Sequence, residues 1–181
     1  MSEIRIYTET DMTNLLFTSD NKKRIAERLQ PLGIRYEQWQ TADALSAGAD
    51  SEQVMAAYQP DIDRLKAEGG YQTVDVISLT ADHPQKDELR QKFLSEHTHS
   101  EDEVRFFVAG QGLFTLHLED KVVEILCTAG DLISVPANTR HWFDMGPEPE
   151  FIAIRLFNNP QGWVAEYTGS DIASHYNRLE D

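Results

Sequence analysis

The chain has 181 residues, which at roughly 150 residues per domain corresponds to one domain. Its 16 lysines and arginines against 31 aspartates and glutamates give a formal net charge of −15. Nucleic acids and anionic membranes bind basic patches, so we expect neither as a partner. Cys127 is the only cysteine, which excludes a framework of internal disulfides. Without a signal peptide or an apolar run long enough to span a membrane, the sequence predicts a cytoplasmic protein.

The first residues predict two strands with a helix between them. Ile4 and Ile6 alternate with polar residues, as in a short strand. Asp20 is the expected N-cap of a helix that Gly33 ends. A second strand is expected over residues 34–39.

Residues 50–93 predict a long helix, a strand and another helix. Pro60 should kink the long helix, and Gly69 and Gly70 should end it. The strand is expected over residues 74–79, and Pro84 suits the first turn of the next helix. The apolar stripe of the long helix consists of Val54, Tyr58, Ile62 and Leu65.

The second half of the chain reads as short β runs from residue 104 to residue 157. Runs at this spacing predict an antiparallel barrel or sandwich. We therefore expect a single domain with a mixed lead-in over 1–92, a barrel core over 93–158 and a tail over 159–181. The helices of the lead-in should pack on the barrel. Turn signals separate the runs at residues 110–112, 119–120, 130–131, 136–138 and 146–147.

The residues that carry chemistry lie in and beside this β region. In extended backbone, residues two apart point to the same side, so His97 and His99 converge, and Glu103 and Arg105 share a face. His141 follows a later β run. A His-x-His pair alone often binds no metal, but three imidazoles and one carboxylate suit a divalent first-row metal. Four such ligands in an octahedron leave two positions for a chelating substrate.

The order of these residues resembles the two signature motifs of the cupin superfamily, which are small jelly-roll barrels. Asn138 stands where the second motif usually has glycine, and asparagine also tolerates a left-handed turn. More specific blocks resemble the bacterial acireductone dioxygenase family, and the resemblance spans nearly the whole chain. These blocks cover residues 93–99, 101–108, 131–137, 141–146 and 153–155.

This resemblance implies a mainly β cupin barrel with several α-helices packed in the N-terminal lead-in. It also implies an enzyme that cleaves acireductone, the enediol of methionine salvage, with O2. With iron the products would be formate and the keto acid precursor of methionine; with nickel, methylthiopropionate, formate and carbon monoxide. One Fe(II) or Ni(II) per chain and no organic cofactor are expected. The implied metal ligands are His97, His99, Glu103 and His141.

The resemblance gives further residues roles, each with a plainer alternative. Arg105 would favour formation of the substrate dianion, or it could form a salt bridge with Asp102. Glu96 would assist metal loading and Asp102 conformational coupling, although both could be ordinary surface or supporting carboxylates. The aromatic candidates could be core residues, and Arg155 could face solvent. The residues expected to bind substrate are Phe93, Phe143, Arg155 and Trp163.

Two residues outside the implied site and two alternative functions remain. His117 lies on a predicted strand but matches no ligand position, and Cys127 reads as a buried thiol. The same ligands would serve a cupin isomerase or epimerase without O2, or a non-catalytic cupin that binds a small ligand. Oxygen uptake with an enediol separates the first function from both alternatives. No heptad seam is present, so a monomer is expected.

Overall fold

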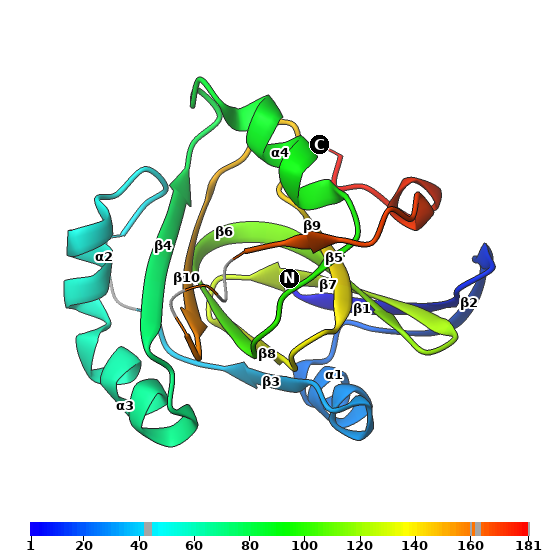
Figure 1. Ribbon diagram of the computed structural model, residues 1–181, viewed down its shortest axis with the longest axis horizontal. Helices are drawn as coiled ribbons and strands as arrows, with labels where there is room; N and C mark the ends of the chain where they lie inside the picture. The colour runs from blue at the N-terminus through cyan, green and yellow to red at the C-terminus, as the bar shows by residue number, and fades with distance from the viewer. Residues whose placement is uncertain (42–44, 160, 162–163, 181) are drawn as a thin grey trace.

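The computed structural model describes residues 1–41, 45–159, 161 and 164–180. These form two antiparallel sheets, joined through one shared strand, that wrap around a common core (Figure 1). The helices are α1 (Lys22–Leu29), α2 (Ser51–Ala57), α3 (Gln59–Gly69), α4 (Lys86–Leu94) and the short 3-10 helices η1 (Gln30–Leu32) and η2 (Ile172–His175). The strands are β1 (Glu3–Thr8), β2 (Asp11–Ser19), β3 (Arg35–Gln38), β4 (Thr73–Leu79), β5 (His97–Thr98), β6 (Glu103–Leu118), β7 (Lys121–Thr128), β8 (Asp131–Val135), β9 (Arg140–Asp144), β10 (Phe151–Phe157) and β11 (Glu166–Tyr167).

The long strand β6 belongs to both sheets. Its first half pairs with β10 and β8, and its second half pairs with β7 and β9. The predicted turn at residues 110–112 is therefore wrong, because β6 continues through it. Gly110 has φ of 73°, and a Cβ there would lie 1.8 Å from the Glu150 carbonyl oxygen. This glycine lets the strand bend and change partners without a turn.

The N-terminal lead-in contributes strands as well as helices. The strands predicted near Ile4, over 34–39 and over 74–79 correspond to β1, β3 and β4, whereas β2 was not predicted. β2 extends as an edge strand beside β1, and the two form a hairpin that projects from the barrel (Figure 1). In the same view α2 and α3 lie outside β4. The mainly β barrel with packed helices is thus confirmed.

Three local predictions in the lead-in need correction. The N-cap of α1 is Asn21 and not Asp20, because the Asn21 side chain accepts a hydrogen bond from the Arg24 N–H. Pro60 does not kink one helix but lies in the first turn of α3, and Tyr58 separates α3 from α2. Pro84 lies before α4, whose N-cap is Gln85.

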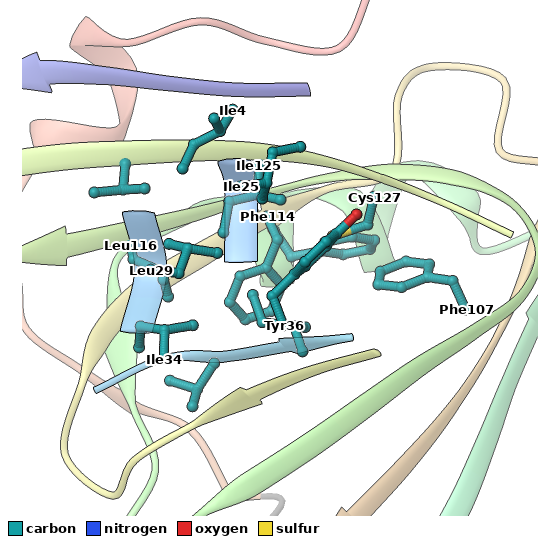
Figure 2. Close-up of a cluster of buried hydrophobic side chains, with 14 of the residues drawn as sticks. Ile4, Ile25, Leu29, Ile34, Tyr36, Phe107, Phe114, Leu116, Ile125 and Cys127 are labelled. Atoms are coloured by element: carbon teal, nitrogen blue, oxygen red, sulfur yellow. The ribbon is translucent and has the colours of Figure 1, made fainter. Parts of the chain in front are cut away.

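The core fills the space between the two sheets. Figure 2 shows side chains from β1, α1, β3, β6 and β7 meeting there. The thiol of Cys127 is fully buried among them, as the sequence predicted, and burial raises its pKa. A second cluster joins the apolar stripe of α2 and α3 to the outer face of β6 and β10. Among the described residues, no helix is long and apolar enough to cross a membrane.

Candidate metal centre

Three histidines converge at one end of the barrel. β5 and β9 pair so that His97 lies opposite His141, and His99 follows β5 directly. One ring nitrogen from each of the three lies within 4.8 Å of the others. All three side chains are at least 95% buried, with exposed fractions of 5%, 5% and 2%. The alternation expected for His97 and His99 therefore does bring them together.

Backbone carbonyls orient each of these rings. In every case Nδ1 lies within hydrogen-bond distance of a main-chain oxygen, which fixes the hydrogen on Nδ1 and leaves the lone pair on Nε2. The rings thus present their Nε2 atoms to the space between them. The carbonyls, for His97, His99 and His141 in turn, belong to Ser95 at 2.7 Å, Val164 at 3.1 Å and Thr139 at 2.8 Å.

Glu103 completes the cluster with an oxygen that lacks a partner. Its Oε2 lies 3.6 Å from His99 Nε2 and 3.9 Å from His141 Nε2. Within the described part of the chain, neither this oxygen nor His141 Nε2 has a hydrogen-bond partner, although both are buried. Leaving a buried carboxylate oxygen and a buried lone pair without partners costs stability. A cation bound between Glu103 Oε2 and His141 Nε2 would remove that cost.

The protonation states also suit a cation. Burial lowers the pKa of His97 to about 4 and that of His141 to about 3, so both rings are neutral at pH 7. Burial is the largest single influence and opposes ionisation of Glu103, but the charge of Arg105 together with smaller contributions from other neighbouring groups outweighs it, and the pKa of Glu103 falls to about 2. The cluster therefore offers neutral imidazoles from His97 and His141 and one carboxylate, donors that suit divalent first-row metals.

Asn138 and Asp102 tie the two halves of the cluster together. Asn138 adopts a left-handed conformation with φ of 62°, as its place in the motif predicted, and its N–H donates to the His99 carbonyl at 2.8 Å. The Asp102 carboxylate accepts the Ala137 N–H at 2.7 Å. The turn that precedes His141 is thereby fastened to the segment that carries His99. The Asp102 carboxylate therefore bonds to the backbone of this turn and makes no salt bridge with Arg105.

Arg105 pairs with Glu103 instead. Its Nε and Nη2 donate to Glu103 Oε1 at 3.1 and 2.9 Å. The guanidinium also lies over two rings, 5.1 Å from the centroid of Phe114 and 4.7 Å from that of Phe143. Arg105 is 4% exposed, and of the polar atoms described its Nη1 has no partner. One donor of a buried cation is therefore free.

A cavity of about 340 Å³ opens onto these groups. Phe93 and Phe143, two of the residues expected to bind substrate, line it, whereas Trp163 lies outside the described residues. Arg155 also lines the cavity, but Asp75 already binds its Nε and Nη2 at 2.9 and 2.6 Å. Strand β4 and helix α4 supply apolar wall, including Val76, Leu79 and Leu89. The cavity thus has a polar floor and an apolar side.

Glu96 and His117 form a buried pair next to the cluster. Glu96 Oε2 lies 2.6 Å from His117 Nδ1, and the Thr168 hydroxyl donates to Glu96 Oε1 at 2.8 Å. The sequence interpretation discounted His117 because it matched no ligand position. The alternation of Leu116 and Leu118 around it did indicate a buried strand, but its acidic partner is 21 residues away.

Comparisons with known proteins agree with this geometry. The model of the ARD/ARD' family matches residues 3–165. An acireductone dioxygenase of Alcanivorax borkumensis is 61% identical over 178 residues, which is 98% of each chain. One of Pseudomonas paraeruginosa is 58% identical over 181 residues and covers all of both chains.

A solved structure shares the fold. It is an acireductone dioxygenase from Bacillus anthracis with a cadmium ion in its active centre, and it is 34% identical to this chain. The match covers 92% of this chain and 98% of that one, with a TM-score of 0.78.

Proposed function

Because the chain belongs to the ARD/ARD' family, that of the acireductone dioxygenases, we propose that it cleaves acireductone with O2. The observation that carries this proposal is the unpartnered Oε2 of Glu103, which faces the unpartnered Nε2 of His141, a residue that lines the cavity. An isomerase or a binding cupin would use the same ligands. The free donor of Arg105 favours a substrate with anionic oxygens over a neutral sugar.

The four residues that would hold the metal are His97, His99, Glu103 and His141. Their donors and protonation states fit a divalent ion, and the related Bacillus anthracis protein carries cadmium in its active centre. We propose one Fe(II) or Ni(II) per chain and no organic cofactor. When bound, the ion would supply Lewis acidity and a template for the two enediol oxygens.

The residues around the ligands would bind and orient the substrate. Arg105 is held by Glu103 and by two rings, so its Nη1 can donate to a substrate oxygen without reorganising first. That contact would favour the dianion of the enediol. Phe93 and Phe143 would exclude water, and the apolar wall near Leu79 would accept the methylthio tail. Arg155 would add positive charge while Asp75 holds it in place.

Supporting residues would keep the ligands in position. Glu96 and Asp102 lie beside the ligand strand and bond to other segments, which supports roles in metal loading and conformational coupling. We propose that iron directs the reaction to formate and the keto acid precursor of methionine. Nickel would give methylthiopropionate, formate and carbon monoxide. The protein would then serve methionine salvage in the cytoplasm, as a monomer.

Product analysis tests this function. Metal-free protein is loaded with Fe(II) or with Ni(II), mixed with acireductone in oxygenated buffer, and the products are identified by NMR and by gas analysis. We expect formate with both metals, the keto acid with iron, and carbon monoxide with nickel. Bound metal without oxygen uptake above the no-enzyme control would favour the isomerase or the binding cupin.

A further inference from the structure

His117 lies directly behind the candidate ligands. Its neighbour Leu116 is fully buried in the barrel core and lies opposite His141 in the β6–β9 register. Because side chains alternate along a strand, His117 occupies the other face of β6. Glu96 likewise precedes His97 and lies on the side away from it. The pair of Glu96 and His117 thus backs the sheet whose inner face carries His97 and His141.

Four segments of the chain meet at this pair. His117 Nδ1 lies 2.6 Å from Glu96 Oε2, and its Nε2 lies 2.8 Å from Glu9 Oε2 in the β1–β2 turn. Thr168, after β11, donates its hydroxyl to Glu96 Oε1 and its N–H to the Glu96 carbonyl at 2.8 and 3.1 Å. Two carboxylates thus flank the one ring.

The strand that carries His97 forms only a short ladder with each of its neighbours. β5 is two residues long; it pairs with β9 only at His97 and with β11 only at Tyr167 and Glu166. So short a ladder fixes the strand poorly. Glu96 is 2% exposed and immediately precedes it, so the anchoring of that carboxylate determines where β5 begins.

We propose that His117 is a positioning residue for the metal centre: by clamping Glu96, it sets the place of His97. This inference rests on the proposed metal site and adds a residue outside the ligand set. Without His117, Thr168 would be the one side-chain partner that the described residues leave to the buried Glu96 carboxylate, which would have to move towards water. Loss of a residue that orients a ligand typically lowers metal affinity about 10- to 100-fold, and we expect that range for His117→Leu.

Nickel titration tests the proposal without reference to turnover. The affinity of the metal-free full chain for Ni(II) is measured by calorimetry for the wild type, His117→Leu, His117→Gln and Thr168→Val. His117→Gln keeps one amide donor for Glu96, so it should retain more affinity than His117→Leu. Circular dichroism shows which variants are folded. If His117→Leu does not fold, His117→Gln and Thr168→Val still carry the test.

The matched control is Tyr36→Phe. The Tyr36 hydroxyl donates to Asp131 Oδ1 at 2.9 Å, so this change also removes a donor from a fully buried carboxylate, away from β5. We expect wild-type nickel affinity in the control. Wild-type affinity in folded His117 variants, or an equal loss in Tyr36→Phe, would overturn the proposal. A wild type that binds nickel but consumes no O2 with acireductone would refute the proposed function and leave the His117 comparison intact.

Discussion

Replacing Arg105 with methionine isolates the contribution of one buried donor. In the structure, Nε and Nη2 serve Glu103, and only Nη1 is free to reach a substrate oxygen. Methionine keeps much of the volume between Phe114 and Phe143, so the change removes the charge with little cavity. Glu103 loses the Arg105 charge that lowers its pKa, but its Oε2 makes no bond to Arg105, and a bound divalent ion would itself favour the ionised carboxylate.

The free donor sets the size of the expected effect. A hydrogen bond to a charged group contributes about 1.5–3 kcal/mol, and each 1.36 kcal/mol changes a rate about tenfold. Arg105→Met should therefore lower kcat/KM for acireductone about 10- to 150-fold while the metal content stays near one ion per chain.

An oxygen electrode and elemental analysis on the same preparations check this prediction. Arg64→Met is the matched control, because Arg64 also pairs with a carboxylate, Asp61 at 3.3 Å, and lies 4.4 Å over the ring of Trp39. It lies outside the cavity lining and should keep wild-type kcat/KM. Wild-type kcat/KM in metal-loaded Arg105→Met would refute the role of Nη1.

Two further predictions concern stability. Burial disfavours the Asp144 carboxylate, but hydrogen bonds from Arg90 and two backbone N–H groups outweigh it and lower its pKa below the usual 3.8. The ionised Asp144 carboxylate therefore stabilises the fold fully above pH 3.8, and this stabilisation is lost as the pH falls through the lower folded pKa. In urea unfolding experiments, Asp144→Asn should be less stable than the wild type near neutral pH, and the difference in the free energy of unfolding should shrink in acid. A difference in unfolding free energy that does not change with pH would contradict this. A Cβ on Gly112 would lie 2.3 Å from the Phe143 ring. Gly112→Ala should therefore lower the free energy of unfolding by about 1–3 kcal/mol in the same urea experiments, and the additional change Phe143→Leu should restore part of that stability. No recovery in the double variant would argue against that contact.

The convergence of His97 and His99 was predictable because its rule is local, whereas the resemblance to known motifs was needed to place His141 beside them. His97 and His99 are two residues apart in extended backbone, and the left-handed turn at Asn138 follows from its residue type. The buried state of Cys127 followed from simple alternation along its strand. Each of these predictions depends on neighbours within a few positions in the sequence.

Other features depend on partners that the sequence does not bring close. His117 contacts Glu96 and Glu9, which are 21 and 108 residues away, and Arg155 is fixed by Asp75 at a separation of 80. The edge strand β2 has mostly exposed residues, so its pattern carried no core-facing alternation. Gly110 suggested a turn because the sequence alone does not distinguish a glycine that bends a strand from a glycine that reverses the chain.

The central claim is that one metal ion held by His97, His99, Glu103 and His141 is required for oxygen consumption with acireductone. Fe(II) is added stepwise to metal-free protein under anaerobic conditions, and oxygen uptake is then measured for each sample. The account predicts a rate that rises linearly and stops rising at one ion per chain, with no rise in folded His141→Ala. Uptake that needs no added metal, or that persists in His141→Ala, would contradict it.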